Sequence, residues 1–165
     1  MRRKLGFSLV ELVIVVVIIG VIAAIAIPRM SRAARGAADA ALWADLAGLR
    51  NCIDMYAAEH GGAWPGADGD TATLIDQLTK KTDVVGNVGT TAGVHIYGPY
   101  LRRFPPIPVG PNIGATQVIT TSTIPLTLVI DESDAEYGWI YNFQTGDIIA
   151  NTDDLDDNGV GYDTF

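Results

Sequence analysis

Residues 4–28 read KLGFSLVELVIVVVIIGVIAAIAIP, a lysine and a Gly-Phe pair followed by an almost unbroken apolar run. From Phe7 to Ile27 there are 21 residues, enough for about 32 Å of helix at 1.5 Å per residue. This length matches the hydrocarbon core of a bilayer, about 30 Å. The only ionisable side chain in the run is Glu11, which at a bilayer centre would cost about 2.5–3.5 kcal/mol. The stretch therefore predicts a membrane-spanning helix in which Glu11 needs a partner.

An ordinary secretory signal peptide is the alternative for this segment. Basic residues at positions 2–4, an apolar run and the small-residue site Ala24-Ile25-Ala26 fit such a peptide, with a mature chain starting at Ile27. Against it, the uninterrupted run Leu12–Ile27 is long for a signal peptide. The basic residues also predict an N-terminus in the cytoplasm, with the remaining chain outside the inner membrane.

The order of residues at this junction resembles a known family. The stretch from Lys4 to Glu11, followed by the apolar run with Gly20 and Pro28, is similar to the class III leader of type IV pilins and type II secretion pseudopilins. The resemblance implies that residues 1–6 are a leader peptide. It implies that the prepilin peptidase cuts between Gly6 and Phe7 and then methylates the new amine of Phe7.

Glu11 corresponds to the glutamate that the family uses in assembly. Cleavage creates an ammonium group at Phe7, and a carboxylate on a neighbouring helix can pair with it, so that the cost of holding both charges near lipid falls. The resemblance implies that this pair sets the axial register between subunits. The alternative is that Glu11 only marks the membrane interface. Gly20 and Pro28 correspond to positions where family helices loosen, although both also occur in ordinary membrane helices.

The apolar pattern continues beyond Pro28 into an amphipathic helix over residues 29–59. One stripe at spacings of three and four predicts the face that covers a core: Leu42, Leu46, Leu49, Ile53 and Tyr56. The sequence His60-Gly61-Gly62 predicts the end of this helix. A coiled-coil seam is the alternative use of the stripe, and the short run and its alanine-rich first half weaken it.

The rest of the chain predicts one short helix and a small sheet. The helix is expected over Thr71–Lys81, and a proline-rich crossing follows over residues 99–111. Strands are expected at Leu126–Ile130, Gly138–Asn142 and Asp147–Ala150, the last two joined by the turn FQTG. The stretch GWIYNFQTGDIIAN also resembles the terminal hairpin of major pseudopilins. The predicted fold is α+β and pilin-like, with a long N-terminal helix packed on a small antiparallel C-terminal sheet.

Three parts of the chain are therefore expected. They are a cleaved leader at 1–6, a transmembrane or filament-core helix at 7–28, and a periplasmic globular domain at 29–165. The resemblance places the protein in the inner membrane as a single-pass chain with a cytoplasmic N-terminus.

Charge is unevenly distributed along the sequence. The net charge is −8, and from Asp131 to Phe165 there are ten acidic residues and no Lys or Arg. An acidic surface of this kind repels nucleic acid and suits divalent cations. Direct nucleic-acid binding is therefore not expected.

The C-terminal sequence NTDDLDDNGVGYDTF contains a candidate calcium loop. Asp154, Asp156 and Asn158, followed by a glycine, fit the first half of the D-x-[DN]-x-[DN]-G pattern, in which oxygen ligands converge on a hard cation. Asp153 or Asp163 could complete the shell, together with a backbone carbonyl. The bidentate glutamate of an EF-hand is missing, so a solvated acidic tail is the alternative. Major pseudopilins carry a C-terminal calcium site in a comparable loop.

Other residues indicate no catalytic chemistry. The single cysteine, Cys52, excludes an intrachain disulfide and is expected to be a small buried side chain. His60 and His95 have no companion ligand pattern, and neither a nucleotide loop nor a nucleophile–base constellation occurs. The chain is not expected to be an enzyme.

The resemblance implies a structural subunit of a type II secretion pseudopilus. Its partners would be further copies in a helical filament, minor pseudopilins, the prepilin peptidase, and an inner-membrane platform driven by a cytoplasmic ATPase. One alternative is a type IV pilin for adhesion, motility or DNA uptake, although many such pilins close a C-terminal loop by a disulfide. A second alternative is a membrane-tethered, calcium-dependent binding module, which would have no use for Glu11.

Overall fold

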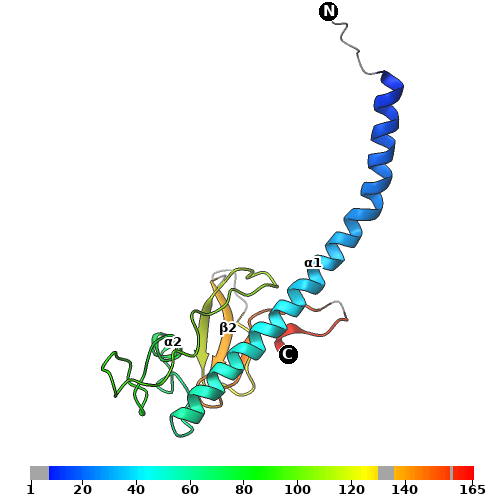
Figure 1. Cartoon of the computed structure of the whole chain (residues 1–165). Helices are drawn as coiled ribbons and strands as arrows, with labels where there is room; N and C mark the ends of the chain where they lie inside the picture. The colour runs from blue at the N-terminus through cyan, green and yellow to red at the C-terminus, as the bar shows by residue number, and fades with distance from the viewer. Residues whose placement is uncertain (1–7, 130–135, 157) are drawn as a thin grey trace, which may run out of the picture. The chain divides into compact units, whose positions relative to one another are not determined.

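The computed structural model describes residues 8–129, 136–156 and 158–165. Its elements are α1 (Leu9–Glu59), α2 (Thr71–Thr79), β1 (Gln117–Thr121), β2 (Tyr137–Asn142), β3 (Ile148–Ala150) and the 3₁₀ helix η2 (Tyr162–Thr164) (Figure 1). By its internal contacts the chain divides into two units, Met1–Ala37 and Ala38–Phe165. Helix α1 contributes residues to both. The α+β class and the long N-terminal helix are confirmed.

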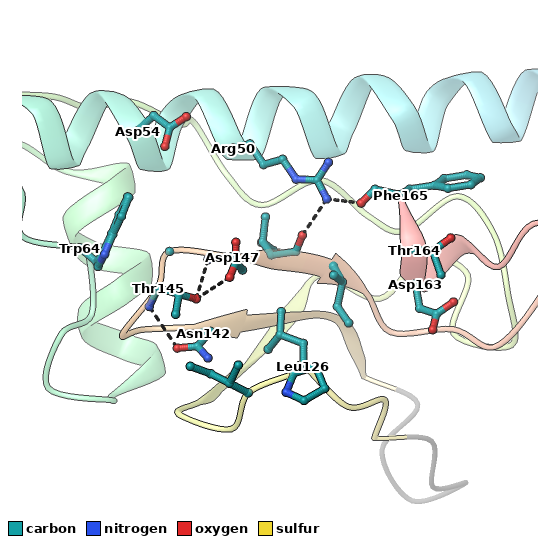
Figure 2. Close-up of a pocket in the computed structure, with 15 residues that line it drawn as sticks. Arg50, Asp54, Trp64, Leu126, Asn142, Thr145, Asp147, Asp163, Thr164 and Phe165 are labelled. Carbon is teal, nitrogen blue, oxygen red and sulfur yellow. Dashed lines mark hydrogen bonds between the residues drawn. The ribbon is translucent and has the colours of Figure 1, made fainter.

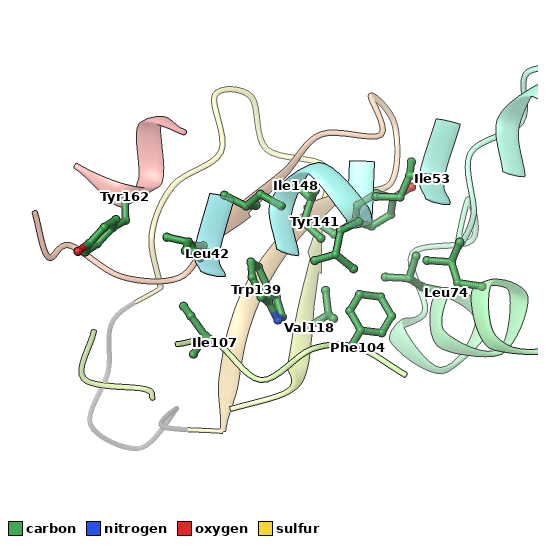
Figure 3. Close-up of a cluster of buried hydrophobic side chains, with 14 of the residues drawn as sticks. Leu42, Ile53, Leu74, Phe104, Ile107, Val118, Trp139, Tyr141, Ile148 and Tyr162 are labelled. Atoms are coloured by element: carbon green, nitrogen blue, oxygen red, sulfur yellow. The ribbon is translucent and has the colours of Figure 1, made fainter. Parts of the chain in front are cut away.

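In the unit Ala38–Phe165, the predicted apolar stripe of α1 is the centre of the core. Its members are all at most 2% exposed: Leu42, Leu46, Leu49, Ile53 and Tyr56. They pack with side chains from the sheet, among them Trp139, Tyr141 and Ile148 (Figure 3). Burial of each aliphatic side chain contributes about 1.5–3 kcal/mol. The prediction that this stripe covers a sheet is confirmed.

Helix α1 ends where the His-Gly-Gly sequence predicted it would. Gly61 has φ +67°, and the Gly62 amide donates to the Ala57 carbonyl over 2.8 Å, which satisfies one of the last carbonyl groups of the helix. His60 is buried and stacks on Tyr56. Its Nδ1 lies 2.8 Å from the Tyr56 carbonyl and its Nε2 lies 2.9 Å from Thr82 Oγ1. The histidine therefore joins the helix end to the following loop.

Helix α2 is two residues shorter than predicted. Asp70 caps its N-terminus by accepting from the Thr73 amide over 3.3 Å. Leu74 and Leu78 are fully buried against the core. The helix stops at Thr79 because Lys80 adopts extended backbone and Thr82 then pairs with Tyr97 in a β-bridge.

The sheet has three strands in the order β1-β2-β3 and is mixed, not antiparallel throughout. The predicted hairpin is confirmed: β2 and β3 are antiparallel, with Trp139 opposite Ala150. Its turn requires glycine at position 146, where φ is +78° and a Cβ atom would lie 2.6 Å from the ring of Trp64. Strand β1 instead runs parallel to β2, with Val118 opposite Trp139.

The predicted strand Leu126–Ile130 is wrong for its described residues. Leu126–Val129 has irregular backbone, and Ile130 lies outside the described residues. The reason is that the Asn151 side chain, not a neighbouring strand, pairs with Val129. Its amide nitrogen donates to the Val129 carbonyl over 2.9 Å, and its oxygen accepts from the Val129 amide over 3.1 Å. The third strand comes from Gln117–Thr121, a segment with a weaker apolar pattern.

Candidate functional site: the exposed apolar helix and the C-terminal segment

In the unit Met1–Ala37, helix α1 begins at Leu9 and carries Glu11 in its first turn. Gly6 and Phe7, the predicted processing residues, lie outside the described residues. The position of Glu11 suits a carboxylate, because the free amide groups of the first turn carry partial positive charge. Its side chain is exposed, so it remains available to a partner.

The apolar side chains that follow Glu11 are exposed as well. From Leu9, at 80%, to Ile27, at 67%, the large aliphatic side chains of this segment are between 48% and 80% exposed. Helix α1 is also the one described helix that is long and apolar enough to cross a membrane. An apolar surface of this extent marks a site that lipid or another protein covers.

Gly20 and Pro28, the predicted loosening positions, both lie within α1. No atom lies within 4 Å of a Cβ placed on Gly20, apart from the backbone of the helix itself. The helical assignment runs through Pro28 without a break. Loosening at these positions stays a prediction.

Comparison with known proteins gives one match. Residues 1–27 match the family model of the prokaryotic N-terminal methylation motif. The match supports a type IV pilin-like protein. The motif and the apolar segment that contains it fit membrane anchoring. Searches of curated proteins and of solved structures found no match.

At the other end of the sequence, a clasp of three contacts holds the C-terminal residues against α1. Tyr162 donates a short hydrogen bond to Asp39. Phe165 stacks on Trp43, with ring centroids 4.2 Å apart. Arg50 donates to the carbonyl oxygens of Ile148, over 3.2 Å, and of Phe165 (Figure 2). The sequence analysis missed this clasp, because its helix residues lie outside the apolar stripe and their partners are over 90 positions away.

The clasp also determines the electrostatics of Tyr162. Burial, the hydrogen bond to Asp39 and the nearby negative charges of Asp154 and Asp156 all raise the pKa of its hydroxyl group. The phenol therefore keeps its proton, and its role as a hydrogen-bond donor, to a higher pH than a solvent-exposed tyrosine does.

Between the clasp and β3 lies the predicted calcium loop, which is closed by its own hydrogen bonds. The Asp156 carboxylate accepts from the amides of Val160 and Asn158, each over 2.8 Å. These bonds, with that of Val160 first, lower the pKa of Asp156. The side-chain amide of Asn158 donates to the same carboxylate over 3.1 Å.

The predicted ligands are thus only partly brought together. Asp156 and Asn158 are bonded to each other, whereas Asp153 and Asp154 are exposed and Asp163 is half-buried. Within the described residues, no group of three or more His, Cys, Asp or Glu side chains has the arrangement of a metal site. The described side chains therefore do not form a ready calcium cage, and calcium binding stays a prediction.

One open groove of about 690 Å³ lies beside the clasp. Figure 2 shows Arg50, Asp54, Trp64 and Asp147 around it, and Asp163 also lines it. Its only lining cation, Arg50, already donates to two backbone carbonyls. The hydroxyl group of Thr145, also in the lining, donates to the Asp147 carboxylate over 2.6 Å.

Proposed function

We propose that the chain is a structural subunit of a type II secretion pseudopilus. The prepilin peptidase removes residues 1–6, and the mature chain polymerises from the inner membrane into a periplasmic filament that supports protein export. The observation that carries this proposal is the exposed apolar helix Leu9–Ile27 with Glu11 in its first turn. The methylation motif covers the same residues. Such a helix is suited to lie in lipid before assembly and in the core of a filament after it.

The physical role of Glu11 follows from the membrane. Lipid tails are as apolar as the helix surface, so there is no hydrophobic gain when one such helix leaves lipid for another. Close packing and polar pairing must then favour association. A carboxylate near lipid is costly alone and less so beside the amine of a neighbouring Phe7. Pairing between Glu11 and that amine therefore stabilises the assembled state relative to the isolated subunit in the membrane.

A type IV pilin for adhesion, motility or DNA uptake is the second candidate. The C-terminal loop of this chain is closed by hydrogen bonds of Asp156 and by the clasp, in a sequence with one cysteine. That cysteine, Cys52, lies on α1, and its thiol donates to the Tyr100 carbonyl over 3.1 Å. A non-covalent closure favours the pseudopilin, because many pilins use a disulfide there.

The mature N-terminus is the first measurement. Intact mass of protein extracted from native membranes is expected to give a chain that begins at N-methylated Phe7. A chain beginning at Ile27 would instead mean a signal peptide and no filament. Assembly is tested by cross-linking in cells: Glu11→Leu should abolish multimers, and the matched control Glu11→Asp should retain them in part.

Secretion is tested by deleting the gene and measuring exported proteins in the medium. The pseudopilus proposal expects export to fail while surface fibres are unaffected. Normal export together with lost surface fibres would favour the pilin.

A further inference from the structure

Three arginines follow the apolar segment on α1 and have no partner within the described residues. Arg29, Arg32 and Arg35 are all exposed, and no hydrogen bond or ion pair of their guanidinium groups occurs in the part of the chain that the structure describes. They are spaced three residues apart, so they lie along one side of the helix, within about 120° of its circumference. No acidic residue occurs between Glu11 and Asp39. Asp39, one turn after Arg35, is the first acidic residue that follows Glu11, and its carboxylate accepts from Tyr162. This arginine row is therefore a positively charged helix face.

The position of the row is set by the length of the apolar segment. Arg29 lies 18 residues after Glu11, a rise of about 27 Å along the helix. The hydrocarbon core of a bilayer is about 30 Å thick, and each headgroup layer adds about 5–8 Å. With Leu9–Ile27 inserted, Glu11 lies at one edge of the hydrocarbon. Arg29, Arg32 and Arg35 then lie in and just beyond the headgroup layer at the opposite edge.

The chemistry of the row fits the phosphate groups in that layer. All three residues are arginine, whose planar guanidinium group can donate two parallel hydrogen bonds to one phosphate. Each basic residue near an anionic membrane surface strengthens binding about fivefold. The side chains are exposed, and within the described residues no ion pair to them occurs.

We propose that Arg29, Arg32 and Arg35 bind lipid phosphates in the leaflet at the C-terminal end of the span, and so fix the depth of the inserted subunit. This inference rests on the membrane insertion that is part of the proposed function. The lipid contacts hold Glu11 at the opposite edge of the hydrocarbon. There its carboxylate is accessible to the Phe7 amine of a neighbouring subunit. A subunit that moves from the bilayer into a filament has to exchange these phosphate contacts for others.

The test measures insertion depth in the full mature chain. Cys52→Ser removes the native thiol, and a spin label on Ala37→Cys or Ala24→Cys reports the position of the helix by collision with polar and apolar quenchers. The protein is reconstituted in vesicles of phosphatidylcholine and phosphatidylglycerol. The variant is Arg29→Gln/Arg32→Gln/Arg35→Gln. The control, Lys81→Gln/Arg102→Gln/Arg103→Gln, removes three exposed charges from the unit Ala38–Phe165.

In the arginine variant, both labels are expected to shift along the membrane normal by about one helical turn, roughly 5 Å. Phosphatidylglycerol that co-purifies with the protein is expected to fall at least fivefold. The control variant should change neither quantity. Replacement of the three arginines by lysine should restore the depth in part, because charge is kept and the paired hydrogen bonds are lost.

Unchanged depth and lipid content in the arginine variant would overturn the proposal. If that variant kept its depth but lost multimers in cells, the arginine row would instead serve contact with another copy of the chain. A water-accessible label at Ala24 of the otherwise unaltered chain would overturn both this inference and membrane insertion. A correctly inserted chain that fails to polymerise would count against the filament alone.

Discussion

Trp43 on α1 and Phe165 at the other end of the sequence stack with their ring planes inclined by 21°. Phe165 also meets Tyr162 edge to face, at 5.4 Å between ring centroids. The aromatic contacts, with the bonds from Tyr162 to Asp39 and from Arg50 to Phe165, attach η2 to the helix. The acidic loop before η2 is thereby anchored at its base.

The clasp is expected to stabilise the C-terminal segment locally. Trp43→Ala should lower the free energy of unfolding by about 0.5–1.5 kcal/mol through the lost aromatic pair, in addition to lost apolar contact. Trp43→Phe keeps a stacked ring and should lose less. Chemical denaturation of the full chain in detergent measures both. Hydrogen exchange should rise at Tyr162–Thr164 in Trp43→Ala, and equal protection in both variants would contradict the clasp.

The buried stripe of α1 should dominate the stability of the unit Ala38–Phe165. Leu46 is fully buried, so Leu46→Ala is expected to cost about 2–5 kcal/mol. Met55 lies on the same helix and is 54% exposed. Met55→Ala is the matched control, and its effect should stay within about 0.5 kcal/mol. Similar losses at the two positions would mean that the stripe does not face the core.

Alkaline pH should destabilise the fold through buried tyrosines. Burial raises the pKa of Tyr141, whose hydroxyl donates to the Pro65 carbonyl over 2.9 Å. The unfolded tyrosine loses its proton near pH 10 while the folded one keeps it. Stability is therefore complete below about pH 10 and falls as the pH rises above it, by up to about 1.4 kcal/mol per pH unit for this group. Tyr141→Phe should show a shallower decline between about pH 10 and 11. An unchanged slope would contradict the assignment.

Calcium binding is tested on the full chain. If the loop binds calcium, excess EGTA should lower the melting temperature, and added calcium should restore it. Asp154→Asn is expected to reduce this response, whereas Asp68→Asn, at an exposed acid far from the loop in sequence, should not. An unchanged melting temperature in EGTA would leave the loop closed by its hydrogen bonds alone.

Periodic apolar patterns predicted the parts of the fold that depend on local sequence. The stripe from Leu42 to Tyr56 and the hairpin around Gly146 follow from spacing and turn chemistry. The segment Leu126–Val129 has an equally strong apolar pattern but pairs with the side chain of Asn151. A pairing between one side chain and the backbone of one distant residue produces no periodic pattern in the sequence.

The candidate site also has one part that local sequence predicts and another part that depends on long-range contacts. Residues 1–27 carry a motif that is readable from order and spacing alone. The assembly role of Glu11 was inferred from that motif and stays a prediction. The clasp joins Asp39 to Tyr162 and Trp43 to Phe165, contacts that exist only once the sheet is in place. No local pattern encodes which distant residues meet. The predicted calcium ligands share a sequence pattern, yet Asp156 is bonded to its own loop.

The short strands limit how the folded unit can aggregate. An unpaired strand edge can add a strand from another molecule, and long flat edges are the most prone to do so. Here the two outer strands are β1, with five residues, and β3, with three. On β1, Thr120 donates to the Gly69 carbonyl over 2.7 Å and contacts Thr71. Uncontrolled association through the edges of the sheet is therefore disfavoured.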